Sequence, residues 1–116
     1  MYKPGTHIIA TLTSGQESLL AGYESFKVLT DELVSEFDLN KLGEVYHNFS
    51  PAGFTAVICL SESHISIHTW PEYGLVNMDI YLSNFQRTND ETVHKICDAY
   101  VNFFKAEIKH IQTITR

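Results

Sequence analysis

Apolar and polar residues alternate along several short stretches of the chain, as in β-strands that bury one face. On this basis we predict strands at residues 6–13, 42–49, 54–60, 65–70 and 75–83, with a weaker strand at 107–114. The stretch at 54–60 is strongly apolar, and Pro71 closes the strand that precedes it. Residues 50–53, Ser-Pro-Ala-Gly, have the composition of a turn.

Two longer stretches follow the period of a helix instead. Residues 18–37 place one apolar stripe on a predicted first helix, formed by Leu19, Tyr23, Phe26, Leu33 and Phe37. A second helix is predicted to begin at Thr88 as N-cap, with Glu91 completing a capping box. Its buried stripe is formed by Val93, Ile96, Cys97, Tyr100 and Phe104. Together these elements predict an α+β fold, a two-layer sandwich with a largely antiparallel sheet and two helices on one face.

The strands around residue 61 favour a hairpin with a particular register. If Ser61 and Glu62 form a two-residue loop, Leu60 faces Ser63 and Thr55 faces His68. The face away from the helices then carries hydroxyl, thiol and imidazole groups, on Thr55, Cys59, His64, Ser66 and His68. A polar sheet face in so small a protein indicates either a solvated surface or a site shared with a partner subunit.

Composition narrows the class of protein. The 116 residues suit a single domain spanning 1–116, and hydrophobic residues make up 44% of them. The net charge is −6 and no basic patch is visible, so nucleic acid is not expected as a partner. No apolar run is long enough for a membrane helix, and residues 1–5 lack the apolar core of a signal peptide. Cys59 and Cys97 form no disulfide framework, so we expect a cytoplasmic protein that acts without a membrane.

Spacing alone leaves the role of the histidines open. They could be ordinary surface residues on an antiparallel sheet. The spacing of His64 and His68 also suits two zinc ligands, but no carboxylate or cysteine completes a recognisable set, and we expect no metal. A serine hydrolase is disfavoured, because the chain has no Gly-x-Ser-x-Gly elbow.

A longer motif goes beyond spacing. Residues 61–74 read Ser-Glu-Ser-His-Ile-Ser-Ile-His-Thr-Trp-Pro-Glu-Tyr-Gly, which resembles the signature of bacterial and archaeal S-adenosylmethionine decarboxylases. Similar residues flank it at the distances that the family shows, in Gly5-x-His7, in Phe49-x-Pro51-x-Gly53-x-Thr55 and at Asp79. The resemblance extends over residues 5–105, most of the chain.

The resemblance implies a proenzyme that cuts itself at the Glu62–Ser63 bond. By analogy with the family, the Ser63 hydroxyl attacks the Glu62 carbonyl, and a hydroxyl at Thr55, where the family has Ser, stabilises the oxyanion. The imidazole of His68 then removes the α-hydrogen of residue 63. The cofactor implied is a pyruvoyl group made from Ser63, which forms a Schiff base with the substrate and acts as electron sink.

The resemblance also implies a substrate, S-adenosylmethionine, and a pathway, spermidine synthesis. Phe49 is expected to stack on adenine and Glu72 to hold the ribose hydroxyls. Ser83 stands where the family has a proton-donating cysteine, and its hydroxyl is a far weaker acid than a thiol. Two alternatives follow: a pyruvoyl decarboxylase of the same family acting on arginine or ornithine, and a member that neither cleaves nor catalyses. We expect a homodimer with its active site near the interface.

Overall fold

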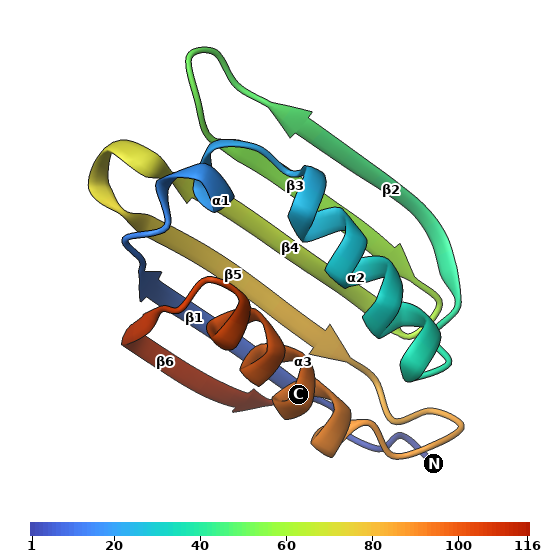
Figure 1. Cartoon of the computed structure of the whole chain (residues 1–116). Helices are drawn as coiled ribbons and strands as arrows, with labels where there is room; N and C mark the ends of the chain where they lie inside the picture. Colours follow the sequence, from blue (N-terminus) through green and yellow to red (C-terminus); the bar gives the residue numbers. More distant parts are fainter.

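The computed structural model describes residues 1–116 as one antiparallel sheet covered on one face by helices (Figure 1). The six strands lie in the order β2-β3-β4-β5-β1-β6. Their bounds are β1 Thr6–Thr13, β2 Lys41–Asn48, β3 Phe54–Leu60, β4 Ser63–Trp70, β5 Leu75–Leu82 and β6 Glu107–Thr115. The predicted α+β sandwich with a largely antiparallel sheet is confirmed.

Three α-helices cover the sheet, one more than predicted: α1 Glu17–Ala21, α2 Glu24–Glu36 and α3 Asp90–Phe103. The prediction of a single helix over residues 18–37 is wrong because the backbone is extended at Gly22 (φ −146°, ψ 157°). After this break the Tyr23 N–H donates to the Asn48 side chain of β2 (2.9 Å), a partner outside the helix. The helical stretch is therefore interrupted at Gly22, where the chain makes a contact with β2.

The helices and one face of the sheet enclose a single apolar core of 22 buried residues. The Phe26 ring of α2 stacks on Tyr100 of α3, with ring centroids 4.8 Å apart, and joins the two longer helices over the sheet. The predicted stripe on the last helix is confirmed, since Val93, Ile96, Cys97, Tyr100 and Phe104 are all buried. Burial raises the pKa of the Cys97 thiol to about 11, so this residue stays neutral in the core.

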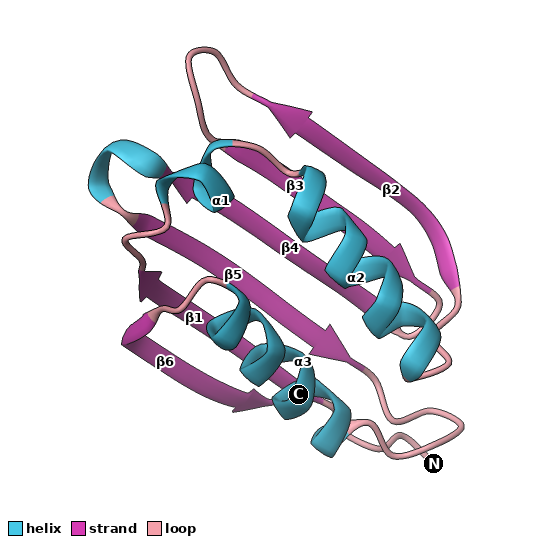
Figure 2. Ribbon diagram, viewed as in Figure 1, coloured by secondary structure: helices cyan, strands magenta, loops and turns pink.

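The β3–β4 hairpin has the predicted register. Leu60 pairs with Ser63 and Thr55 pairs with His68, so Ser61 and Glu62 form the turn. The three α-helices lie on one side of the sheet and none covers the other side, while a short 3₁₀ helix, η1 Pro71–Tyr73, connects β4 to β5 at the end of the sheet (Figure 2). We call this uncovered side the open face. No helix of the chain combines the length and apolar character that crossing a bilayer requires.

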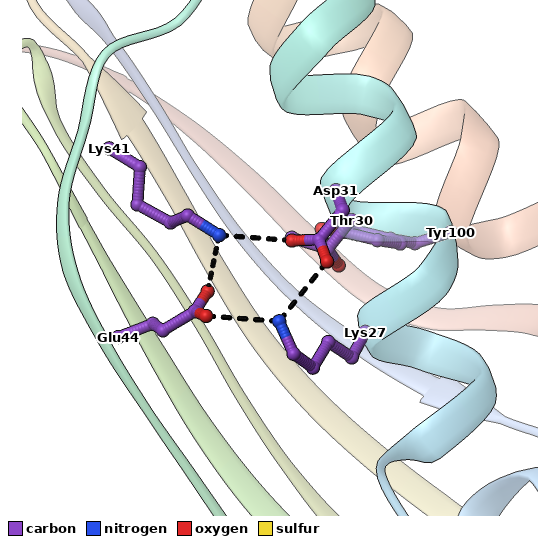
Figure 3. Close-up of polar contacts among 6 residues, drawn as sticks. All are labelled: Lys27, Thr30, Asp31, Lys41, Glu44 and Tyr100. Atoms are coloured by element: carbon purple, nitrogen blue, oxygen red, sulfur yellow. Dashed lines mark hydrogen bonds and ion pairs between the residues drawn. The ribbon is translucent and has the colours of Figure 1, made fainter.

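The edge strand β2 is tied to α2 by four charged side chains (Figure 3). Lys27 and Asp31 of α2 and Lys41 and Glu44 of β2 alternate in sign around a ring, with contacts of 2.7–3.1 Å. Because the ring is partly exposed to water, its ion pairs are expected to contribute little to the stability of the fold. It places charge along an edge strand, which disfavours pairing with another chain there.

Beneath this ring, α2 and α3 share one buried hydrogen bond. The hydroxyl groups of Thr30 and Tyr100 lie 2.8 Å apart, and both residues are fully buried. Burial raises the pKa of the Tyr100 phenol, so its hydroxyl stays protonated and available for this bond.

We therefore predict that Tyr100→Phe lowers the free energy of unfolding by roughly 1–3 kcal/mol, because it leaves the Thr30 hydroxyl buried without its partner. Urea unfolding followed by circular dichroism measures the loss. The control is Tyr73→Phe, since Tyr73 is 76% exposed. Equal stability of the two variants would contradict the role of the Thr30–Tyr100 bond.

Candidate functional site

The first group of site residues lies at the end of the sheet where β3 turns into β4 and β5 ends. Because Ser63 pairs with Leu82, the last residue of β5, the residue that follows the strand, Ser83, comes level with the turn. The backbone N–H of Ser83 donates to the carbonyl oxygen of Glu62 at 2.7 Å. A hydrogen-bond donor is thus already in place on the carbonyl of the Glu62–Ser63 peptide bond.

Ser63 has a backbone conformation that side chains rarely adopt. Its φ angle is +137°, and it is one of three non-glycine residues in the chain with a positive φ. Such a conformation costs on the order of 1–3 kcal/mol and persists only where the surrounding structure enforces it. Strain of this kind is found at functional sites, and here it falls on the residue that follows the polarised carbonyl.

The side chain of Glu62 is held from two directions. Arg87 donates to both carboxylate oxygens, at 2.7 and 3.1 Å, and Asn89 donates to Oε2 at 2.5 Å. The hydrogen bonds from Arg87 keep the pKa of the Glu62 carboxyl below its usual value, although partial burial opposes them. A polar cavity of about 610 Å³ opens here, with Glu62, Ser83 and Arg87 in its wall.

Asn89 explains why the predicted capping box does not form. The helix begins at Asp90, and Asn89 occupies the N-cap position without a side-chain cap hydrogen bond. Its side-chain amide donates instead to Glu62 and to the carbonyl oxygen of Ser83 (2.8 Å). The N-terminus of α3 is therefore fixed to the β3–β4 turn, and the capping role predicted for Thr88 is wrong.

The second group of site residues lies at the opposite end of β4. The hydroxyl of Thr55 and Nδ1 of His68 form a hydrogen bond across the β3–β4 pair. Beside them is a cavity of about 330 Å³ lined by Phe49, His68, Trp70 and Glu72 among others. The rings of Phe49 and Trp70 are 51% and 38% exposed, so two aromatic surfaces and a carboxylate are available to a ligand.

These two groups are separated along one strand. Ser63 and His68 are both in β4, and five residues of extended chain span about 16 Å. The fold thus brings Thr55 to His68, and Phe49 to the cavity that Glu72 lines, but it brings neither pair to Ser63. Within one chain, His68 cannot reach the α-hydrogen of residue 63.

A third polar cluster lies between them on the open face. The spacing of His64 and His68 would suit two zinc ligands, although no metal was expected, and in the structure His64 contacts Asp79 (3.1 Å), which also bonds to His7. The potential ligand atoms of His7, His64 and Asp79 lie within 4.8 Å of one another. Arg116 donates to Nδ1 of His7 at 3.1 Å, so Nε2 of His7 carries the proton that it donates to Asp79. This cluster is satisfied by its own hydrogen bonds.

Sequence reasoning missed Arg87 and Asn89. Neither belongs to a motif, and Asn89 lies between two residues of the expected capping box. Their contacts with Glu62 span 25 and 27 positions in the chain and depend on the loop between β5 and α3. A polar loop directly after a strand that ends at the site was the one available signal.

Comparisons with known proteins agree on one family. Residues 6–116 match the family model described as S-adenosylmethionine decarboxylase. The S-adenosylmethionine decarboxylase proenzyme of Archaeoglobus fulgidus is 42% identical over 103 residues, which cover 89% of this chain and 88% of that protein. The proenzyme of Picrophilus torridus is 36% identical over 107 residues, covering 89% and 82%. The crystal structure of the adenosylmethionine decarboxylase from Aquifex aeolicus VF5 superimposes with a TM-score of 0.79 at 29% identity, over 100% of this chain and 91% of that one.

The backbone of Ser63 yields a prediction about stability. Glycine adopts a positive φ without the penalty that a side chain carries, so Ser63→Gly should be more stable than Ser63→Ala by about 1 kcal/mol. Both variants lack the hydroxyl, which makes their covalent states the same. Thermal unfolding of the two proteins measures the difference.

The matched control uses Ser66, three residues further along β4, whose φ is not positive. There the order should reverse, with Ser66→Ala more stable than Ser66→Gly, because glycine weakens a strand interior. The same order at both positions would mean that Ser63 is not strained.

Proposed function

Because the chain belongs to the S-adenosylmethionine decarboxylase family, we propose that it is a proenzyme that cleaves itself between Glu62 and Ser63 and then acts on S-adenosylmethionine as a decarboxylase. The family and the lyase class predicted from residues 61–74 are confirmed by the comparisons. The observation that carries the cleavage proposal is the hydrogen bond from the Ser83 N–H to the Glu62 carbonyl, next to a strained Ser63.

The first step uses residues that this chain already holds together. The Ser63 hydroxyl attacks the Glu62 carbonyl carbon, and negative charge develops on the oxygen that accepts the Ser83 N–H. The C–N bond then breaks and the nitrogen takes up the proton that the Ser63 hydroxyl loses, which leaves an ester between Glu62 and the Ser63 side chain and a free amine on residue 63. The strain at Ser63 favours this step, since breaking the peptide bond releases the constraint on φ.

The second step needs a base. Removal of the Ser63 α-hydrogen expels the Glu62 carboxylate from Cβ, and the dehydroalanine that remains is hydrolysed with loss of ammonia to give a pyruvoyl group. We assign the base to His68. In place of the oxyanion role expected for Thr55, we assign its hydroxyl to orienting this base, because these two residues are already hydrogen-bonded as a pair. The pair lies about 16 Å from Ser63 of the same chain, so it must act on a second copy.

A homodimer resolves this separation. If two chains pack their open faces with their β4 strands running in opposite directions, the His68 end of each chain meets the Ser63 end of the other. The open face has apolar side chains for such a contact: Val45, Val57 and Trp70 are 65%, 44% and 38% exposed. Each dimer then holds two composite sites.

Ser63 would be the precursor of a pyruvoyl group, and the Glu62 carbonyl that precedes it already accepts a hydrogen bond from Ser83, which lines the polar cavity of about 610 Å³. Once formed, the group supplies an electron sink for loss of carbon dioxide. Phe49 and Trp70 offer stacking surfaces for adenine, and Glu72 offers a carboxylate to the ribose hydroxyls. Ser83 is positioned by its backbone, while its side-chain hydroxyl is a weak proton donor.

The first test follows cleavage and activity together. Denaturing mass spectrometry of purified protein should show fragments of residues 1–62 and 63–116, the second with a blocked N-terminus, and Ser63→Ala should remain intact. The cleaved protein should release carbon dioxide from S-adenosylmethionine and not from arginine or ornithine. A chain that stays whole and inactive would favour a non-catalytic member, and release from arginine or ornithine alone would assign a different substrate.

The second test asks whether the site is composite. Ser63→Ala and His68→Ala should each remain uncleaved when produced alone, but co-expression should cleave the His68→Ala chain, because its Ser63 meets the His68 of the other variant. At most half of the mixed dimers' chains can be cut. Absence of any cleavage in the mixture, with both variants folded and dimeric, would contradict the shared site.

A further inference from the structure

The carboxylate of Glu62 has a set of contacts that the cleavage chemistry described so far does not use. Self-cleavage needs the carbonyl of residue 62, and any side chain there could provide it. Yet this side chain receives three hydrogen bonds, from Arg87 at 2.7 and 3.1 Å and from Asn89 at 2.5 Å. Arg87 also donates to the Asp38 carbonyl at 2.8 Å, which anchors the guanidinium to the end of α2.

We infer that Arg87 and Asn89 are positioning residues for self-cleavage, which hold Glu62 on the Ser83 N–H and balance the negative charge that the reaction adds to it. This inference rests on the proposed cleavage and deepens it. We call Arg87, Asn89 and the Glu62 carboxylate the clamp.

The geometry of the clamp supports a positioning role. Asn89 bridges the two backbone segments that must stay in register, since its amide donates to Glu62 Oε2 and to the Ser83 carbonyl oxygen. Asn89 is only 2% exposed and its own N–H is held by the Asn84 side chain at 2.6 Å. The clamp therefore fixes the distance between the Ser83 N–H and the Glu62 carbonyl that it polarises, and fixed donors stabilise developing charge best.

The charges of Glu62 and Arg87 support the same role. Glu62 is already ionised, because its bonds to Arg87 keep its pKa low. The attack places negative charge on the carbonyl oxygen of the same residue, and the elimination turns that group into a carboxylate. Glu62 then carries two negative charges, and Arg87 is the cation that contacts it. Without Arg87, the side-chain carboxylate would repel the charge that each step creates.

Neutralisation of Glu62 by Arg87 can be distinguished from a purely structural role of Arg87. If Arg87 acts by neutralising Glu62, removal of the Glu62 charge should make Arg87 dispensable. If Arg87 only holds the loop between β5 and α3, its loss should slow cleavage whatever residue stands at 62. A double-mutant cycle distinguishes these two cases.

The experiment measures cleavage rates of freshly synthesised chains by pulse-chase in a cell-free translation mixture. We expect Arg87→Met to slow cleavage about tenfold or more, as for loss of charge-assisted hydrogen bonds, and Arg87→Lys to recover much of the rate. Glu62→Gln removes the charge but keeps a side-chain oxygen for the Asn89 amide, so it should cleave more slowly than wild type and faster than Arg87→Met, and the double variant Glu62→Gln/Arg87→Met should match Glu62→Gln. The matched control is Lys95→Met, which breaks the exposed Lys95–Glu91 pair on α3 and should leave the rate unchanged.

Each outcome decides the question. Wild-type rates in Arg87→Met, or a double variant as slow as the product of the two single effects, would overturn the clamp. The clamp would also be overturned if Arg87→Met lowered the thermal midpoint enough to explain slow cleavage. In that case the cleavage rate of the variant would recover to the wild-type value at a lower temperature. If wild-type protein itself does not cleave, the proposed function fails and the clamp with it. If wild-type protein cleaves itself and substitution of Arg87 has no effect, the inference about the clamp is wrong while the proposed function stands.

Discussion

An extended strand cannot bring its two ends together, and this constraint shapes the molecule. β4 carries Ser63 at its first position and His68 near its last, with a straight run of antiparallel pairing on both sides. The proposed cleavage assigns the base to His68, so under that proposal a second copy has to supply the imidazole. The open face of the sheet, the exposed apolar residues on it and the separate aromatic cavity all fit this requirement.

The two ends of β4 differ in how they are prepared. At the Ser63 end the protein uses backbone geometry: a strained φ and an N–H that donates to one carbonyl, held in place by Arg87 and Asn89 from the segment before α3. At the His68 end it uses side chains, in a hydroxyl–imidazole pair beside two exposed rings. One end can therefore hold a reacting bond in place, while the other can exchange protons and receive a planar ligand.

The sequence predicted most of the fold because alternation over whole strands is a strong signal. The register of the hairpin followed from the same alternation, since a slip of one residue would have turned Ile65 and Ile67 away from the core. The break at Gly22 was missed because its cause, the bond from Tyr23 to Asn48, joins residues 25 positions apart. The motif identified Ser63, His68, Phe49 and Glu72, but spacing along one chain could not reveal that they form two groups, and nothing local marked Arg87.

The order of the strands decides what the proposed cut does to the molecule. Residues 1–62 contain β1, β2 and β3, and residues 63–116 contain β4, β5 and β6. In the sheet these two sets interleave, because β1 lies between β5 and β6 while β3 pairs with β4. Three strand pairs, β3–β4, β5–β1 and β1–β6, would therefore hold the two fragments together. If the fragments separated, their pairing would no longer be unimolecular, because the short covalent connection between them would be gone. If the proposed cut occurs, the covalent connection is needed only while the chain folds, and the three strand pairs then hold the two fragments together.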